Sequence, residues 1–151
     1  MIAANKTLVR RHFDEVLNQG QLEVIDELYA ETYVLDAPVQ TDGSVQAHNH
    51  TVGRDGLKRR VILFRTAFPD LTFTLENLIA EGEFVVAQYR FCGTHLGDFR
   101  ELAPTGKRID VGGMLIAHVR EGRIQSVYSV FDSGDLLRQL CPDPEISAGQ
   151  R

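Results

Sequence analysis

The feature that most constrains the fold of this chain is a change in the spacing of its apolar residues near Pro69. Before Pro69, apolar residues recur every three or four positions, as on one face of a helix. After it, apolar and polar residues alternate from Leu71 to Glu76, which is typical of a half-buried strand. Helices followed by meandering strands predict an α+β fold in which helices cover one face of an antiparallel sheet.

Three helices are expected before Pro69, each with one apolar stripe. The stripes are Val9, Phe13, Val16 and Leu17; Leu22, Ile25, Leu28 and Tyr29; and Leu57, Val61, Phe64 and Phe68. Between the second and third stripes, residues 39–53 are rich in Asp, Gly, Ser, Asn and His. So long a polar stretch is expected to be either a mobile lid or a segment that contains a short strand.

The second half predicts further strands and a short final helix. A turn at 81–83 leads into a strand at 84–92, and a glycine- and proline-containing loop leads into a strand at about 108–119. A tight turn at 120–123 starts the last strand, and residues 135–140 form a final helical turn or two. We expect residues 1–141 to form a single domain and 142–151 to be a disordered tail. The strongly curved sheet and its helices should form a barrel-like cone around one apolar pocket, a natural small-molecule site.

Composition and charge exclude several kinds of partner. The chain has 16 basic and 21 acidic residues, a net charge of −5, and no basic cluster that suggests nucleic acid or an anionic membrane surface. No apolar run has membrane-spanning length and the N-terminus is polar, so a cytoplasmic location is expected. Cys92 and Cys141 are interpreted as free thiols.

Asp132 is the leading chemical candidate, because it ends the apolar strand-like run 124–131. A dry, unpaired carboxylate is costly there, so Asp132 must be solvated, cap the following helix, or face a cavity that uses it. Ser133 offers an equally good helix cap one residue later. In an apolar cavity, the pKa of Asp132 would rise, as a general acid or base requires.

The histidines are weaker candidates. His118 interrupts an apolar run. It is either a satisfied core or edge histidine, or a functional residue that donates a hydrogen bond to a substrate oxygen or orients Asp132. His95 follows Gly93 and Thr94 and is expected mainly to stabilise a loop. His48 and His50 have the spacing of two ligands on one strand face, but no third ligand lies nearby, so no metal site is predicted.

Several polar residues could line the pocket. Asp36 is either a second pocket acid or a turn residue next to Pro38. Tyr33, Tyr89 and Tyr128 are expected in the pocket wall, with hydroxyl groups that need partners. Residues 104–107 do not form a phosphate-binding loop, because the first glycine and the final Ser/Thr of that motif are missing.

In their order and spacing, these segments resemble the SnoaL-like polyketide cyclase family, within the nuclear-transport-factor-two-like superfamily of α+β cones. The resemblance covers about residues 5–140 and rests mostly on markers of the fold. The matching residues are Ala67-Phe68-Pro69-Asp70, Gly93-Thr94-His95 with Gly97, Pro104-Thr105-Gly106-Lys107, Glu121-Gly122-Arg123-Ile124, and Asp132 with Leu136-Leu137-Arg138-Gln139-Leu140.

The resemblance implies an intramolecular aldol cyclisation of a polyketide ester, without a metal or covalent intermediate. No organic cofactor is expected either, because the sequence has no dinucleotide-binding or P-loop signature. The resemblance places the family's catalytic carboxylate on Asp132 and its pocket histidine on His118. This chain departs from many relatives at positions expected to line the pocket. Asp36 replaces a His and Gln88 an Arg, while Ser126 and Tyr128 stand where Glu and Trp are common.

Two classes of function remain open. The first is a cofactor-free enzyme that acts on a hydrophobic carbonyl compound, as a cyclase, isomerase or dehydratase with Asp132 as acid or base. The second is a non-catalytic protein that binds a small apolar ligand or serves as a dimerisation module. An Asp132 that is free in an open apolar cavity favours the enzyme, and one that is paired and sealed favours a structural role.

Two structural expectations bear on the site. The strands at 84–92 and 108–119 are apolar on both faces, so a homodimer through the outer sheet face is predicted. The hairpin at 120–123 decides which way His118 points. A two-residue loop would turn His118 away from Asp132, whereas a three-residue loop with Gly122 left-handed would place both in the pocket. We predict the three-residue loop, because the family resemblance implies that both residues face the pocket.

Overall fold

The computed structural model describes residues 1–41 and 44–141, and the side chains of 38–49 lie outside the description. The predicted disorder of 142–151 therefore concerns residues outside the described part. Within it, one sheet and the helices packed on it share a single buried core. No helix of this part is long and apolar enough to cross a membrane.

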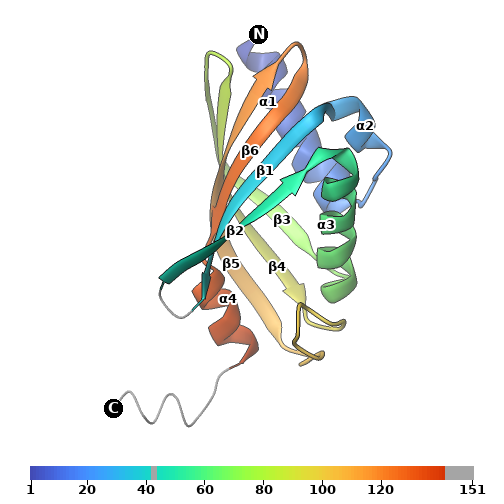
Figure 1. Cartoon of the computed structure of the whole chain (residues 1–151), viewed down its shortest axis with the longest axis vertical. Coiled ribbons are helices and arrows are strands. Elements are labelled where there is room, and N and C mark those ends of the chain that lie inside the picture. Colours follow the sequence, from blue (N-terminus) through green and yellow to red (C-terminus); the bar gives the residue numbers. More distant parts are fainter. Residues whose placement is uncertain (42–43, 142–151) are drawn as a thin grey trace.

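The helices mostly follow the predicted stripes. Helix α1 (Ile2–Arg11) continues as a π-helical segment, η1 (His12–Asn18), and α2 (Val24–Leu28) is short. Helix α3 (Gly53–Ala67) ends just before Pro69, and α4 (Ser133–Leu140) follows the last strand. The α3 ribbon lies across the inner face of the sheet, with α1 and α2 toward one end (Figure 1).

Six strands form the sheet in the order β2-β1-β6-β5-β4-β3. Their bounds are β1 Tyr29–Thr41, β2 Ser44–Val52, β3 Thr72–Glu81, β4 Phe84–Thr94, β5 Arg108–Arg120 and β6 Arg123–Phe131. All neighbouring pairs are antiparallel except β1 and β6, which are parallel. The sheet is strongly curved but unclosed, because β2 and β3 form its free edges (Figure 1).

Strand β1 was not predicted, and it changes the interpretation of the polar stretch 39–53. The chain leaves α2 at Tyr29 directly into β1, which pairs with β2 as a hairpin over much of that stretch. The strand alternative for residues 39–53 is therefore confirmed. The stretch adds an edge strand to the sheet rather than a structureless lid.

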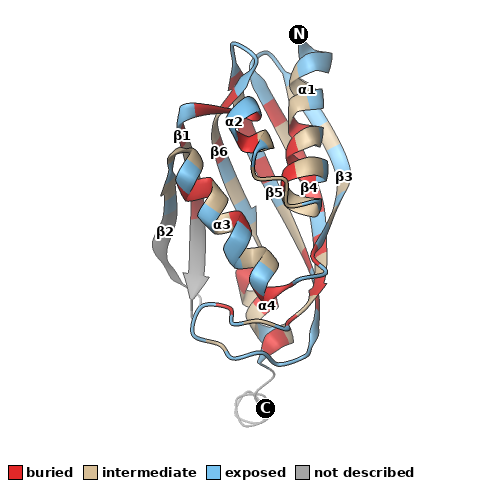
Figure 2. Cartoon of the chain, turned by 90° about the vertical axis from the view of Figure 1, so that its right-hand side faces the viewer, coloured by how far each residue is buried: buried red, intermediate tan, exposed pale blue. Residues whose placement is uncertain are grey.

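Alternation along the strands separates an inner, buried face from an outer one. On β5, Leu115, Ala117 and Val119 are buried, whereas Met114 and Ile116 are exposed. Buried residues, coloured red, recur along the strands between less buried ones (Figure 2). A residue must therefore lie on the inner face of its strand to reach the space beneath α3.

Candidate active site

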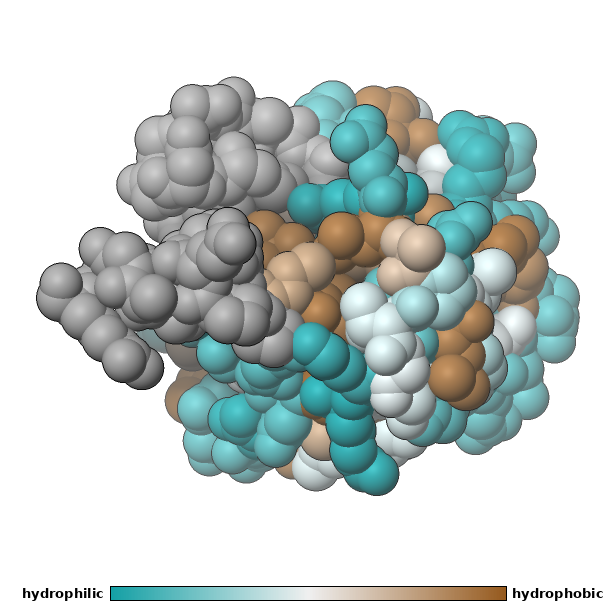
Figure 3. Space-filling model, turned by 90° about the horizontal axis from the view of Figure 1, so that it is seen from below, coloured by the Kyte–Doolittle hydropathy of each residue, from teal (hydrophilic) through white to brown (hydrophobic). Residues whose placement is uncertain are grey.

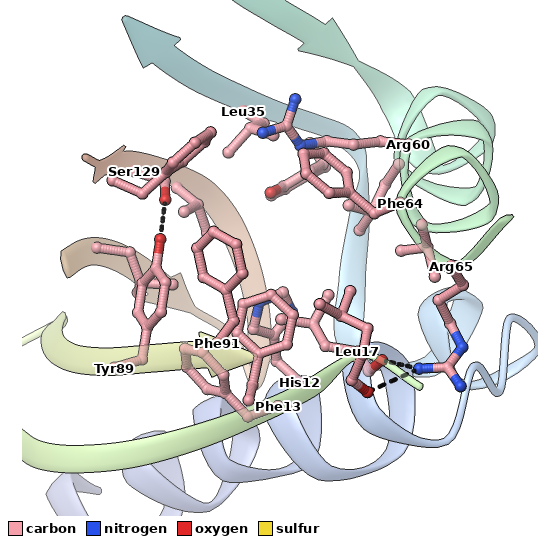
Figure 4. Close-up of a pocket in the computed structure, with 18 residues that line it drawn as sticks. His12, Phe13, Leu17, Leu35, Arg60, Phe64, Arg65, Tyr89, Phe91 and Ser129 are labelled. Atoms are coloured by element: carbon pink, nitrogen blue, oxygen red, sulfur yellow. Dashed lines mark hydrogen bonds between the residues drawn. The ribbon is translucent and has the colours of Figure 1, made fainter. Parts of the chain in front are cut away.

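The candidate site is a cavity of about 80 Å³ between α3, η1 and the inner face of the sheet. Its wall is mainly apolar and aromatic, with side chains from both helical segments and five strands. Representative wall residues are Phe13, Leu17, Leu35, Phe64 and Phe91 (Figure 4). Apolar surface is also visible within a hollow at the end of the molecule seen in Figure 3. An apolar lining of this kind is typical of sites for hydrophobic small molecules.

His12 is the titratable group with the most unusual position in the cavity. It is the first residue of η1, is buried, and lines the cavity wall (Figure 4). Its Nδ1 atom contacts the hydroxyl group of Tyr29. Burial lowers the pKa of His12 from 6.5 to about 4, so the imidazole is neutral at neutral pH.

The second ring nitrogen of His12, Nε2, keeps accessible surface. Among the described residues, the only fully buried side-chain nitrogen or oxygen without a hydrogen-bond partner is Nε2 of His95. Nε2 of His12 also has no hydrogen bond to the described residues, but it is not among these fully buried atoms. Part of its surface is therefore accessible. Because His12 lines the cavity, Nε2 can meet a bound ligand there. Local π-helical geometry is often found at functional positions of this kind.

Two tyrosines bring neutral hydroxyl groups to the cavity. Tyr33 on β1 is buried, its ring packs on Tyr29 at 4.8 Å between centroids, and burial raises its pKa, with a smaller opposing effect of Arg60. Tyr89 on β4 shares a 3.0 Å hydrogen bond with the Ser129 hydroxyl (Figure 4). Burial raises the pKa of Tyr89, although the Ser129 hydrogen bond opposes this. Both phenols stay protonated at neutral pH and can donate to a ligand oxygen.

Two arginines of α3 also line the cavity, with different surroundings. Arg65 donates to the backbone oxygens of Leu17 and Leu71, at 2.8 and 3.4 Å, and so ties α3 to the neighbouring segments. Arg60 lies over the Phe64 ring, 5.1 Å from its centroid, and forms no ion pair with a described carboxylate. Burial lowers the pKa of Arg60, but an arginine remains charged in this range.

Asp132 does not point into this cavity, contrary to the prediction. It is the N-cap of α4, and its Oδ1 accepts a 2.9 Å hydrogen bond from the Asp135 backbone N–H. Its side chain is 60% exposed, with the Arg138 guanidinium 4.0 Å away. The sequence left three alternatives for Asp132: a solvated residue, a helix cap or a cavity residue. In the structure, Asp132 is the helix cap. This position does not support its predicted role in proton transfer.

His118 is also outside the cavity, because the predicted three-residue hairpin loop is wrong. Arg120 pairs with Arg123, and the two loop residues Glu121 and Gly122 both have positive φ, 54° and 70°. This is the geometry of a tight primed turn, which matches the twist of its strands. A bulge at Gln125 then sets His118 opposite Ser126, on the outer face. There, His118 stacks on Phe84 and lies 3.6 Å from the Glu83 carboxylate.

Of the five predicted substrate-binding residues, only Tyr33 lines the cavity. Gln88 and Tyr128 alternate onto the outer face, where Gln88 accepts a 2.7 Å hydrogen bond from Asn77. Asp36 also lies outward, since its register partner is Tyr128 and its neighbours Leu35 and Ala37 point inward. Because these positions lie on the outer face of their strands, they cannot contribute to the cavity.

His95 is a loop residue, as expected. It is completely buried, its ring packs on Phe68, and its Nδ1 lies 3.0 Å from the Thr105 hydroxyl. The loop that contains it closes through the His95 N–H and the Lys107 carbonyl at 2.9 Å. The side chain of His48 lies outside the described residues, and His50 is exposed on β2.

A family comparison agrees with this fold and cavity. The model of the family described as SnoaL-like polyketide cyclase matches residues 7–140. The chain belongs to the SnoaL-like polyketide cyclase family. The family resemblance and the α+β fold predicted from sequence are therefore confirmed.

Solved structures share the fold of this SnoaL-like protein at low sequence identity. A candidate SnoaL-like polyketide cyclase from Jannaschia sp. CCS1 has a TM-score of 0.82 and 22% identity, with 94% of each chain covered. AclR, a candidate hydroxylase from Streptomyces galilaeus, has a TM-score of 0.78 and 22% identity, over 99% of this chain and 90% of AclR. IdmH, a candidate polyketide cyclase from Streptomyces antibioticus, has a TM-score of 0.74 and 25% identity, over 90% and 97%. No curated protein matches the chain.

Four polar residues of the cavity in this SnoaL-like protein were not singled out from the sequence: His12, Arg60, Arg65 and Ser129. His12 lies between Val9, Phe13 and Val16, so a polar residue within an apolar helical stripe was the available signal. Arg60 belongs to the basic run Lys58-Arg59-Arg60, and the sequence does not indicate that only Arg60 of this run lines the cavity. Ser129 lies between the exposed residues Tyr128 and Val130 and therefore points to the inner face. This can be recognised only when the register of the strand is known.

Proposed function

We propose that this SnoaL-like protein is a cofactor-free enzyme that moves a proton on a hydrophobic carbonyl substrate bound in the cavity. The proposed reaction is of the intramolecular aldol type that the family resemblance implies. The observation that carries the proposal is that a neutral imidazole, His12, and a phenol, Tyr33, share one apolar cavity. The aromatic wall supports a substrate with an apolar body.

An aldol cyclisation needs a base and a donor, and the cavity offers both. The base removes a carbon-bound proton next to a carbonyl, and a donor stabilises the enolate oxygen. The enolate carbon then forms a bond to a second carbonyl carbon of the same molecule, whose oxygen takes the proton. No electrons are gained or lost overall. The proton can therefore pass from carbon to oxygen through a single side chain.

We assign the base to His12 and the enolate donor to Tyr33. The Nδ1 contact with Tyr29 holds the His12 ring in place and leaves Nε2 for the substrate proton. The Tyr33 hydroxyl has no hydrogen bond to another described residue, so it is available to a substrate oxygen. The hydroxyl pair of Tyr89 and Ser129 offers a second donor in the cavity wall (Figure 4).

The test is hydrogen exchange next to a carbonyl, which reports proton abstraction without requiring the natural substrate. A panel of hydrophobic aryl ketones, beginning with 1-tetralone, would be incubated with the protein in deuterated buffer and followed by NMR. Tyr33→Phe should slow exchange by about 100-fold, the effect of removing one donor to a developing oxyanion. Tyr128→Phe is the matched control, because Tyr128 lies on the outer face and should leave the rate unchanged.

Other outcomes would select a different function. If ketones bind in the cavity but no member of the panel exchanges, the protein is a binder of apolar ligands rather than an enzyme. Equal loss of exchange in Tyr33→Phe and Tyr128→Phe would contradict the assignment of Tyr33.

A further inference from the structure

A second hollow adjoins the cavity on the outer side of α3. It is lined by residues of α3, by Thr51 at the end of β2, and by Phe99 and Arg100 of the loop after β4. Arg60 and Phe64 line both this groove and the cavity, so the two spaces share a wall. A ligand that fills the cavity can therefore extend into the groove past Arg60.

Three arginines face this groove without an acidic partner. Arg59, Arg60 and Arg100 form no ion pair with any described carboxylate, although acidic residues such as Asp55, Asp98 and Glu101 are close in sequence. Elsewhere in the described part, arginines such as Arg11 and Arg90 are paired with carboxylates at 2.8 Å. The groove therefore concentrates positive charge in a protein whose net charge is −5.

Aromatic contacts hold two of these cations in place. Arg60 lies over Phe64 at 5.1 Å, and Arg100 lies over Phe99 at 5.2 Å. The two rings pack against each other with centroids 5.5 Å apart. The guanidinium groups are thus fixed on a shared aromatic support, which reduces the entropy that a ligand must remove on binding.

The backbone of Arg100 adds a sign of strain. Its φ is 54°, a left-handed conformation that is uncommon for a residue with a side chain of this size. Reciprocal hydrogen bonds between Phe99 and Leu102, at 3.0 and 2.9 Å, close the turn that imposes this conformation. Strain of this kind persists where the surrounding structure fixes it, often at a binding position.

Like charges held close together repel, and an anion between them would remove the repulsion. Burial lowers the pKa of Arg60, and Arg100 adds to the lowering. Burial also lowers the pKa of Arg100. The planar guanidinium fork matches the geometry of carboxylate and phosphate oxygens and can bind them through two parallel hydrogen bonds.

We infer that this groove binds an oxyanion, a carboxylate or phosphate, at the end of the substrate whose carbonyl-bearing body occupies the cavity. This inference rests on the proposed function, which places the carbonyl-bearing part of the substrate in the cavity. Arg59 and Arg100 would hold the oxyanion, and Arg60 would lie between it and the apolar part. The substrate is therefore an amphiphile with one anionic end.

Binding calorimetry with three matched probes tests the inference. The probes are a tetralone with a short side chain ending in a carboxylate, its neutral methyl ester, and the corresponding phosphate monoester. Both anions should bind at least ~10-fold tighter than the ester at low salt, and the difference should shrink as salt rises. A tighter phosphate than carboxylate would identify a phosphorylated substrate, and the reverse order would identify a free acid.

Single substitutions then locate the oxyanion. Arg59→Gln and Arg100→Gln should each reduce the affinity for the anionic probes by at least ~3-fold and leave the ester affinity unchanged. Arg123→Gln removes the same charge at the β5–β6 turn and should change neither. If one groove variant does not fold, the other variant and the wild-type comparison of acid and ester still decide.

The inference is overturned if acid and ester bind the wild type equally, or if the groove variants weaken the ester as much as the acid. Failure of the proposed function would look different. It would leave the anion preference intact while the neutral ketones show no hydrogen exchange.

Discussion

At the scale of single residues, His12 lies in the buried cavity environment that was considered for Asp132. Asp132, which the family resemblance led us to expect as the catalytic carboxylate, is exposed and caps α4, whereas His12 is buried in the cavity wall. Burial without a compensating charge keeps His12 neutral, which is the state a proton acceptor needs.

Burial of His12 predicts a specific dependence of stability on pH. Its pKa is 6.5 when unfolded and about 4 when folded, so the unfolded state binds more protons between these values. Its contribution to the unfolding free energy is complete above pH 6.5 and is lost as pH falls through about 4. At pH 4.5, the wild type should lose on the order of 2 kcal/mol more than His12→Gln, relative to pH 7.

Urea unfolding of both proteins at the two pH values measures this difference. Other titrating groups are shared, so they cancel in the comparison. Parallel losses in wild type and His12→Gln would show that His12 is protonated in the folded protein.

At the scale of elements, the glycine pair of β5 shows how the strand makes room for the cavity wall. A Cβ added to Gly113 would lie 2.6 Å from the Tyr89 ring and 2.7 Å from its hydroxyl oxygen. A Cβ on Gly112 would meet only the flexible end of Arg90, at 3.4 Å. Gly113 therefore allows Tyr89 to lie across the strand and reach Ser129.

Gly113→Ala should displace Tyr89 and lower the free energy of unfolding by about 1–3 kcal/mol, the usual cost of overpacking. Gly112→Ala, one residue away on the same strand, should be neutral or slightly stabilising, because alanine loses less conformational entropy than glycine. Chemical denaturation of the two variants gives the comparison. Similar losses in both would mean that the contact with Tyr89 is not what requires Gly113.

The elements that the sequence predicted well are those with long, regular apolar patterns. Strands β4 and β5 and helix α3 lie close to their predicted ranges because their periodicity spans ten residues or more. Strand β1 was missed because it begins immediately after α2 and runs into a polar stretch. The parallel pairing of β1 with β6 joins segments far apart in the chain, which local patterns cannot indicate.

The site was less accessible to sequence reasoning because it depends on single-residue register. Gly122 accepts either hairpin loop, and only the positive φ of Glu121 selects the short loop that turns His118 outward. Tyr33 was expected in the cavity wall and lies there. His12 was not recognised from the sequence, because it lies among the apolar residues of its helix. One residue of register decides which face a side chain occupies.

At the scale of the whole molecule, the outer face of the sheet carries an apolar patch. Met114 pairs with Val130 and Ile116 with Tyr128, and these four neighbouring residues are 44–52% exposed. We propose, as the sequence led us to expect, that a second copy of the chain covers this patch.

Light scattering coupled to size exclusion tests the proposed homodimer. The wild type should have twice the chain mass at micromolar concentration, and Ile116→Glu should shift it to the monomer because a charge would be buried at the interface. Ile2→Glu is the control, since Ile2 is an exposed apolar residue of α1 and should leave the mass unchanged. A monomeric wild type would exclude this arrangement.

The most direct test of the account compares hydrogen exchange of an aryl ketone in two variants, His12→Gln and Asp132→Asn. Each substitution approximately keeps the side-chain shape and hydrogen bonding, and asparagine remains a good N-cap for α4. If the cavity performs the chemistry, His12→Gln should slow exchange by at least ~100-fold and Asp132→Asn should keep the wild-type rate. A large loss in Asp132→Asn with an unchanged rate in His12→Gln would contradict the account and return proton transfer to Asp132.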